Sequence, residues 1–250
     1  VSLGLQHRSQ STHAMPSSFS PIEALIGGLY VGVATGLYML LSGRIAGNSG
    51  ALKALVVGPR DSKVGHVIGL ISAGTAMAIA LPDAFESTSS SSISLFGWGV
   101  ITGLGTGLAN GCTSGHGLCG LSRLSLRSAV AVPIFMGFAI ASSTLATSLE
   151  MRGFSIGPVA PVVVPSARAL NVSLGAAVFL VLTLVPIILS RHTSTRSTLV
   201  SVWTGQAMGS GLVIGGMVRP SVIKGALSPQ QFDLTLWLLF VRLHLTPTHP

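Results

Sequence analysis

The chain has 250 residues, of which 48% are hydrophobic and only 8% are charged. A soluble domain carries roughly a quarter charged residues, so this composition excludes an ordinary soluble enzyme, and the low polarity excludes a disordered chain. The net charge of +8 does not indicate nucleic-acid binding, because the 14 Lys and Arg residues are scattered one or two at a time between apolar runs. The 31 Gly residues lie inside those runs. We therefore expect an all-α polytopic membrane protein, embedded in a lipid bilayer, whose helices pack through small residues.

Seven apolar segments follow one another along the chain, and the first six reach the roughly 17–22 residues that cross a hydrocarbon core as a helix. The six are Pro21–Leu41, Val64–Leu81, Ile93–Ala109, Leu126–Thr147, Leu170–Ser190 and Leu199–Met217, and the weaker seventh is Phe232–Leu245. This pattern predicts about six to seven transmembrane helices in a single membrane domain over residues 21–245, with a polar tail at 1–20 and a short tail at 246–250.

The N-terminal tail is serine-rich, free of acidic residues and without the apolar core of a secretory signal. Arginine and serine without acidic residues are also features of an organelle transit peptide, although this tail contains a single arginine. We favour the plasma membrane, with an organelle membrane as the alternative.

Two connectors differ from ordinary loops, namely SGRIAGNSGALKALVV after the first apolar segment and NGCTSGHGLCGLSRL after the third. Both are apolar enough to enter the membrane, yet glycines break them. Backbone groups at membrane depth must be satisfied by protein or water, so we expect glycine-broken re-entrant segments that line a cavity. For the first connector alone, an external glycine-rich loop is an equal alternative.

A weak internal repeat strengthens this prediction. A Gly-x-x-Thr-Gly-Leu pattern occurs at residues 32–37 and again at 103–108, and a third copy starts at Gly209. Each expected unit, near residues 27–56, 97–127 and 203–227, is a glycine-rich helix, a break and a short half-helix. Transporters commonly build a substrate site where such broken helices meet.

Three side chains with metal-binding chemistry lie in the second break, where Cys112, His116 and Cys119 have C-x3-H-x2-C spacing. A zinc site wants four ligands, and no spacing argument points to His66 as the fourth, so we expect no metal and no cofactor. A thiol is instead a polarizable, weakly donating contact that suits a sulfur-bearing anion. Open backbone N–H groups at helix breaks would add positive potential for that anion.

Several neighbours are candidates to support a substrate pathway, namely Asn110, Gly111, Thr113, Ser114, His116 and Arg123. Arg123 could attract an anion to the entrance. His116 either carries protons or caps backbone carbonyls, and the two alternatives are equal. Asn110 is expected to satisfy freed backbone groups rather than to contact substrate. The chain lacks a Walker-type phosphate loop and has few carboxylates, so we expect no ATP-driven step and no enzyme.

The stretch NGCTSGHGLCGLSRLSLRS resembles the YeeE/YedE family of sulfur transporters, and SGRIAGNSG and GSGLVIGGMVRPSVIKGAL are similar to other patterns of that family. The matches cover Ile22–Phe232 in outline. The resemblance implies an hourglass of helices around re-entrant loops, in which cysteines pass thiosulfate across a constriction through S–H···S contacts. Carried over to this chain, Cys112 is the best relay candidate and Cys119 a weaker one.

The C-terminal end departs from that family's pattern. The third copy carries Gly216 where Cys112 would align, and the last apolar segment stops after about fourteen residues, which is short for a span. The leading hypothesis is uptake of thiosulfate or a related sulfur-containing anion by a C-terminally truncated family member. The alternatives are a non-transporting or incomplete membrane protein that needs a partner or a missing C-terminal half, and a membrane-bound sulfurtransferase with Cys112 as persulfide carrier.

Overall fold

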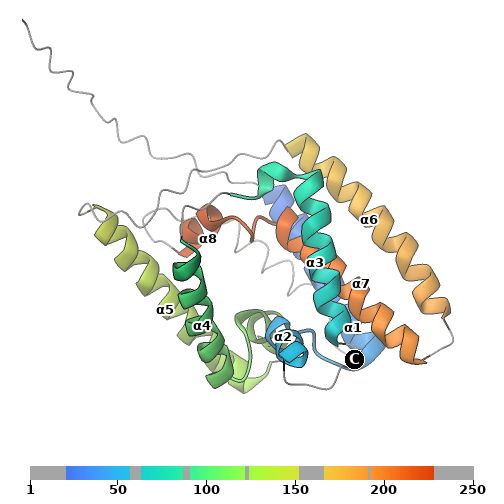
Figure 1. Cartoon of the computed structure of the whole chain (residues 1–250), viewed down its shortest axis with the longest axis horizontal. Helices are drawn as coiled ribbons and strands as arrows, with labels where there is room; N and C mark the ends of the chain where they lie inside the picture. Colours follow the sequence, from blue (N-terminus) through green and yellow to red (C-terminus); the bar gives the residue numbers. More distant parts are fainter. Residues whose placement is uncertain are drawn as a thin grey trace, which may run out of the picture.

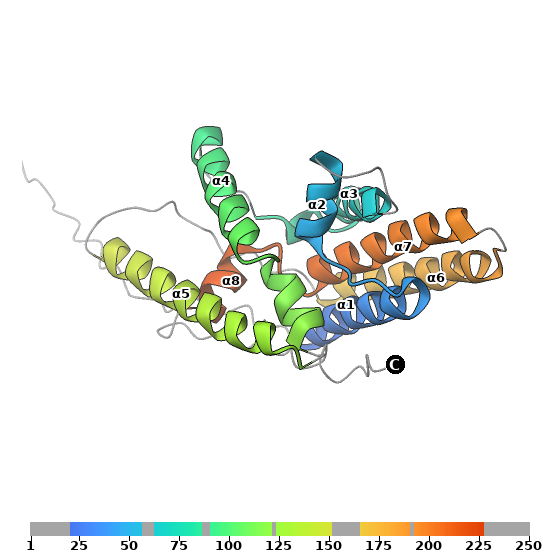
Figure 2. The same ribbon diagram turned by 90° about the horizontal axis from the view of Figure 1, so that it is seen from below.

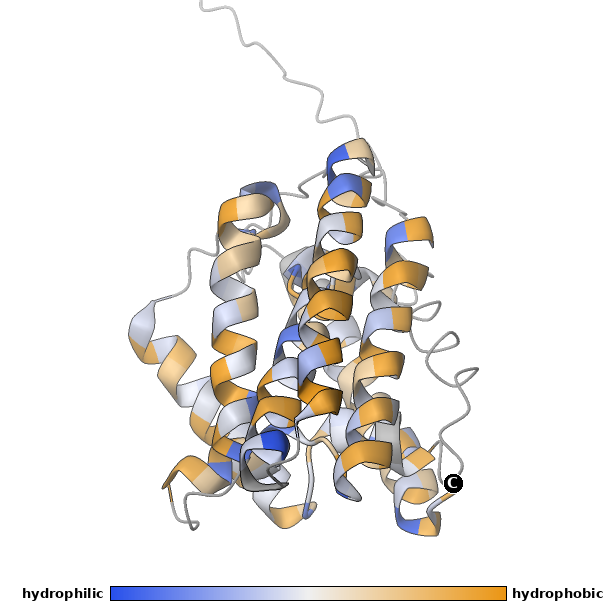
Figure 3. Ribbon diagram, turned by 90° about the vertical axis from the view of Figure 1, so that its right-hand side faces the viewer, coloured by the Kyte–Doolittle hydropathy of each residue, from blue (hydrophilic) through white to orange (hydrophobic). Residues whose placement is uncertain are grey.

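The computed structural model describes residues 21–56, 63–86, 91–121, 124–151, 166–190 and 193–227, and within them it is helical without strands. Among these described residues, four helices are long and apolar enough to cross a membrane, namely α1 (Pro21–Ser42), α3 (Lys63–Ala80), α5 (Leu126–Met151) and α6 (Ser166–Leu189). Hydrophobic residues follow the length of the long helices (Figure 3). The chain is a multi-pass integral membrane protein, as its composition predicts.

Two of the other expected spans are helical but differ from simple lipid-facing helices. Helix α4 (Ser92–Leu108) is apolar and has 17 residues. Helix α7 (Thr193–Ile214) has 22 residues but is less apolar, and its buried side chains include Ser201 and Thr204. These hydroxyls are tolerated because α7 lies among other helices and not against lipid. The seventh expected segment, Phe232–Leu245, lies outside the described residues.

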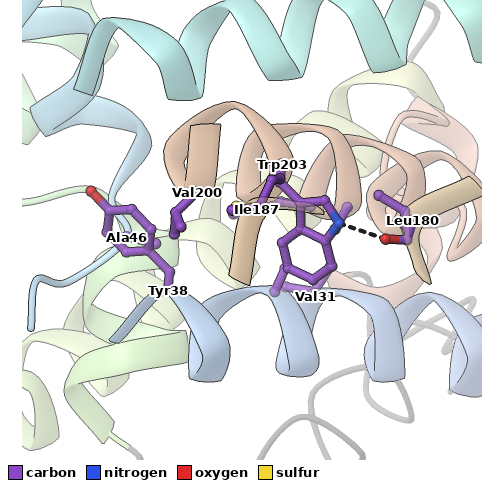
Figure 4. Packing of buried hydrophobic residues seen from close by; sticks show 10 residues of the cluster. Val31, Tyr38, Ala46, Leu180, Ile187, Val200 and Trp203 are labelled. Atoms are coloured by element: carbon purple, nitrogen blue, oxygen red, sulfur yellow. Dashed lines mark hydrogen bonds between the residues drawn. The ribbon is translucent and has the colours of Figure 1, made fainter. Parts of the chain in front are cut away.

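The core is a four-helix bundle in which α7 packs against α3, α1 and α6 (Figure 1). The buried Trp203 of α7 donates its indole N–H to the carbonyl oxygen of Leu180 in α6 at 2.8 Å (Figure 4). Tyr30 of α1 donates its hydroxyl to the carbonyl oxygen of Ser173 in α6 at 2.5 Å. The buried Trp203 and the partly buried Tyr30 thus both satisfy their polar atoms.

Close approach of the helices depends on glycine. A Cβ atom added to Gly69 of α3 would overlap the carbonyl oxygen of Val202, and one added to Gly205 of α7 would overlap the carbonyl oxygen of His66. On the other side of α7, a Cβ atom on Gly27 of α1 would lie 2.5 Å from the Cα atom of Gly215. The expected packing through small residues is therefore present, and it is concentrated on α7.

Helices α4 and α5 form a second group, to one side of the bundle (Figures 1 and 2). None of the residues of α4 is buried. Its large apolar side chains are exposed, including Phe96, Trp98 and Leu104. Between the two groups lie the short helices α2 (Asn48–Val56) and α8 (Pro220–Leu227).

Each of the three expected breaks begins at a residue in the left-handed backbone region. These residues are Gly43 after α1 (φ 63°), Asn110 after α4 (φ 55°) and Gly216 in the turn after α7 (φ 76°). A short helix follows each of them, namely α2, the single π-helical turn η2 (Gly115–Gly120) and α8. A residue in the left-handed conformation ends a helix, and the chain after it continues in a new direction.

The ends of α4 and α7 share one hydrogen-bond pattern. Gly111 N–H donates to the carbonyl oxygen of Thr106 at 3.1 Å, and Met217 N–H donates to that of Leu212 at 2.9 Å. In each case the donor directly follows the left-handed residue, as in a Schellman motif. The helix ends therefore equate Gly216 with Asn110, whereas the sequence comparison aligns Gly216 with Cys112. We prefer the alignment of Gly216 with Asn110, because it rests on the backbone geometry of both helix ends and not on a short sequence match.

We expect Gly69→Ala to lower the free energy of unfolding by about 1–3 kcal/mol, because the added methyl group has no space against α7. Gly74→Ala, in the same helix, is the control, since nothing lies within 4 Å of its Cβ position. It should be neutral or stabilising by about 0.5–1 kcal/mol. Thermal unfolding in detergent micelles measures both changes, and equal melting temperatures of the two variants would contradict the close-packing interpretation.

Candidate functional site

A cavity of about 500 Å³ lies where the first and second breaks meet, within the size range of small-molecule sites. Its lining comes from the first break and α2, from the second break and η2, and from the start of α5. The lining residues are Ile45, Gly47, Ser49, Gly50, Asn110, Gly111, Cys112, Gly115, His116, Gly120, Ser125 and Ser128. Two of the three breaks thus contribute to one cavity.

The half-buried Cys112 lies between α4 and η2, outside the membrane-spanning helices. Its Sγ atom is 2.9 Å from the hydroxyl oxygen of Ser114, and Gly115 N–H donates to the sulfur at 3.4 Å. Ser49, in the first turn of α2, lines the same cavity. Both breaks therefore contribute polar groups to the surroundings of this sulfur atom.

This environment changes the acidity of the thiol. Burial raises the pKa of Cys112, but the hydrogen bonds from Ser114, Ser49 and Gly115 stabilise the thiolate more strongly and lower the pKa from 9.0 to about 7. This thiol therefore loses its proton more readily than an ordinary cysteine. The thiol donates a hydrogen bond, and the thiolate accepts one.

The buried imidazole of His116 is held on both sides. Its Nδ1 atom is 3.0 Å from the hydroxyl oxygen of Ser128, and its Nε2 atom is 3.3 Å from the carbonyl oxygen of Ala109. Because a carbonyl only accepts, this network assigns the proton to Nε2, and Nδ1 accepts from Ser128. Of the two roles expected for His116, this geometry supports carbonyl capping.

The other predicted support residues are distributed unevenly. Asn110 and Gly111 line the cavity, and Ser114 contacts Cys112. Thr113 is exposed and is not part of the lining. The backbone of Cys119 lies in η2, but its side chain, like the whole of Arg123, lies outside the described residues.

Sequence reasoning missed three serines of the lining, namely Ser49, Ser125 and Ser128. Ser49 belongs to the first repeat unit, so the repeat itself was the signal that could have placed it near the second break. Ser125 and Ser128 carried no such signal, because only the fold brings the start of α5 against η2.

The cavity is polar without being acidic. Among the described lining residues, the polar groups are hydroxyls, an amide, a thiol, an imidazole and backbone groups, and none is a carboxylate. Within the described part of the chain, no three His, Cys, Asp or Glu side chains are placed to hold a metal ion. His66, the residue considered as a fourth ligand, contacts Asn48 instead, with its Nε2 atom 3.1 Å from the Oδ1 atom.

We expect His116→Ala to destabilise the protein by about 1–3 kcal/mol, because it leaves the Ala109 carbonyl and the buried Ser128 hydroxyl without their partner. Thermal unfolding in detergent checks this value. The exposed Thr102→Ala is the control, since its hydroxyl bonds only within α4. An unchanged melting temperature together with altered transport would contradict the capping role and favour proton transfer.

Comparison with known proteins places the chain among transporter-like sequences. No protein-family profile and no solved structure matches it. It is similar to two sequences named "probable transporter", from two strains of Xylella fastidiosa. It is 37% identical to each over 123 residues, which are 48% of this chain and 90% of each relative. At this identity over nearly the whole length of these relatives, the chain belongs to the family of these probable transporters.

Proposed function

We propose that the chain takes up thiosulfate, or a related sulfur-containing anion, across the membrane through the cavity between the two breaks. The name of its relatives supports a transport role, and the resemblance of the Cys112 segment to YeeE/YedE transporters supports the substrate class. In this proposal the chain is a carrier in the plasma membrane and not an enzyme, because no bond of the substrate is made or broken.

One observation carries the proposal: Cys112 lines a cavity that both breaks form, and its sulfur lies beside the Ser114 hydroxyl and the Gly115 amide. Thiosulfate has a soft terminal sulfur at one end and oxygen atoms at the other. The S–H group suits the sulfur end, while hydroxyls and backbone amides suit the oxygens. Without a carboxylate in the described lining, an anion meets no fixed negative side chain except the thiolate form of Cys112.

The transfer step consists of exchanging hydrogen bonds. The protonated Cys112 donates its S–H to the terminal sulfur of the anion, and the anion then moves on to the next donor, so that Cys112 keeps its proton. Cys119 is the weaker candidate for a second relay, and Arg123 would attract the anion to the entrance. Only the thiol form can donate, so the balance between thiol and thiolate bears directly on the rate.

We expect Cys112→Ala to reduce uptake of labelled thiosulfate about five- to thirtyfold in cells that lack other sulfur transport, because loss of the S–H donor removes about 1–2 kcal/mol of binding to the anion. Thr102→Ala, on the exposed face of α4, should transport like the wild type. Unchanged uptake by Cys112→Ala would contradict the relay role of Cys112. Absence of uptake by the wild type would contradict the proposed function.

The second candidate, an incomplete membrane protein that needs a partner, is favoured by α4. This helix carries the residues that lead to Cys112, yet none of its side chains is buried. Its glycines at positions 99, 103 and 107 have nothing within 4 Å of their Cβ positions, unlike the packed glycines of α3 and α7. A helix of this kind either faces lipid or binds another protein.

Purified chain in proteoliposomes distinguishes these two candidates. If the chain is a complete carrier, it takes up labelled thiosulfate without any added protein, and Cys112→Ala liposomes stay at the background rate. If a partner is required, the purified chain is inactive although the same chain supports uptake in cells. The second result would contradict a self-sufficient carrier and leave the cavity as one part of a larger pathway.

A further inference from the structure

We propose that His66 is the proton-binding group of this transporter: a proton taken up by its buried imidazole enters together with the anion and couples uptake to the proton gradient. This inference rests on the proposed function, because it supplies the driving force for transport of that anion. It concerns a residue outside the cavity lining, which the transfer step at Cys112 does not use.

Accumulation of a thiosulfate-like anion needs a driving force. The anion is divalent, and its negative charges move against the potential of a membrane that is negative inside. Co-entry of protons offsets this cost and adds the energy of the proton gradient. The carrier then needs a side chain that binds and releases a proton in its interior, and imidazole is the side chain whose charge changes near neutral pH.

The imidazole of His66 lies where α1, α3 and α7 meet. His66 belongs to the first turn of the spanning helix α3 and is 3% exposed. Its backbone carbonyl lies at the close crossing with Gly205 of α7, and the centroid of its ring is 6.5 Å from that of Tyr38 in α1. Ionisable side chains inside a spanning bundle are rare, and they mark ion and proton pathways.

The two ring nitrogens of His66 have different surroundings. Nε2 is 3.1 Å from Oδ1 of Asn48, and this contact assigns the hydrogen to Nε2 because an amide oxygen only accepts. Nδ1 then carries the lone pair, and it is buried without a hydrogen-bond partner in the described structure. Most buried polar atoms have a partner, and the other buried histidine of the described residues, His116, has one for each nitrogen. Nδ1 of His66 is therefore the basic nitrogen that is available for a proton.

Asn48 connects this imidazole to the cavity. It is the first residue of α2, and its two neighbours in the chain, Gly47 and Ser49, line the cavity together with Cys112. A positive charge on His66 thus lies directly behind the wall that an anion meets, and it favours a bound anion. Because coupling between two binding sites is reciprocal, a bound anion also favours the protonated histidine. The proton and the anion are consequently bound together and released together.

The ionisable groups around His66 make this dependence stronger. The acidic residues of the surrounding elements lie at their far ends, Glu23 in the first turn of α1 and Asp83 in the short helix η1 (Pro82–Ala84) beyond the other end of α3. In the described part of the chain, the ionisable side chains at the near ends are not acidic, namely Tyr38 in α1, Arg44 before α2, Lys53 in α2, Lys63 at the start of α3 and Arg196 in α7. The anion in the cavity is therefore the negative group that stabilises the proton on His66.

Purified chain in liposomes tests this coupling, with the membrane potential clamped by potassium and valinomycin. The external pH is the same in all samples, so that the external protonation of Cys112 does not change, and the internal pH is either equal to it or about one unit higher. For each coupled proton, this gradient should raise the accumulation of labelled thiosulfate by up to about tenfold. Addition of thiosulfate should also acidify the lumen, as measured with a trapped pH dye.

His66→Gln removes the titrating group but retains an amide N–H for the contact with Asn48. This variant should lose the response to the gradient, so that the accumulation ratio between the two internal pH values falls to about one. It should still exchange external labelled thiosulfate for internal unlabelled thiosulfate, because exchange needs no net movement of protons. A purely structural role would reduce exchange as well. Thr75→Ala, on the exposed side of the same helix, is the matched control and should respond like the wild type.

Asn48→Ala is a second variant, which leaves the imidazole intact and removes its contact with the first break. It should weaken the gradient response and preserve exchange, and it provides the same test if His66→Gln does not fold. A wild-type chain that ignores the gradient would overturn the inference, as would a His66→Gln variant that still responds to it or a folded one that loses exchange as well.

Exchange by the wild type separates this inference from the proposed function. If the wild type exchanges thiosulfate but shows no response to the gradient, the proposed function stands and the role of His66 fails. If the wild type neither exchanges nor accumulates thiosulfate, the substrate assignment fails, and coupling to that anion fails with it. Exchange by both proteins, together with a gradient response that only the histidine form shows, is the result we expect.

Discussion

The close crossing of α3 and α7 is the contact on which the rest of the structure depends. At this crossing Gly205 lies directly against the carbonyl oxygen of His66, so the backbones of the two helices touch without intervening side chains. The imidazole of that same histidine reaches Asn48 at the start of α2. The next residue, Ser49, lines the cavity together with Cys112. Helix packing in the bundle is thereby connected, through one short series of contacts, to the wall of the cavity.

Helix ends provide the chemistry of the site. A helix that stops inside a membrane protein leaves amide and carbonyl groups that must find partners. At the end of α4, Asn110 adopts the left-handed conformation, and Nε2 of His116 donates a hydrogen bond to the carbonyl oxygen of Ala109. The amide of Gly115 instead donates to the sulfur of Cys112. In this way unsatisfied backbone groups become a set of donors around a thiol, in a lining that contains few ionic groups.

The sequence could predict the helical membrane fold and the positions of the breaks, because both depend on local composition. Apolar length marks the spanning helices, and glycine clusters mark where α1 and α4 end. Cys112 could be selected for the same reason, since it lies inside a glycine-rich break. Ser49 could not be selected as part of the same cavity. An N-terminal serine of a half-helix is a common residue, and only the fold brings it into one lining with a cysteine from a different repeat unit.

The sequence by itself determined that this protein spans a membrane several times and that its second break carries a thiol, since hydropathy and glycine content act over short stretches of chain. Only the tertiary structure decided that α7 is a buried central helix in spite of its hydroxyl groups, and that His116 is held between Ala109 and Ser128. It alone joined the first break to the second around Cys112. Such contacts depend on which surfaces meet in space, and the helix crossings that bring them together are set by glycines far away in the sequence.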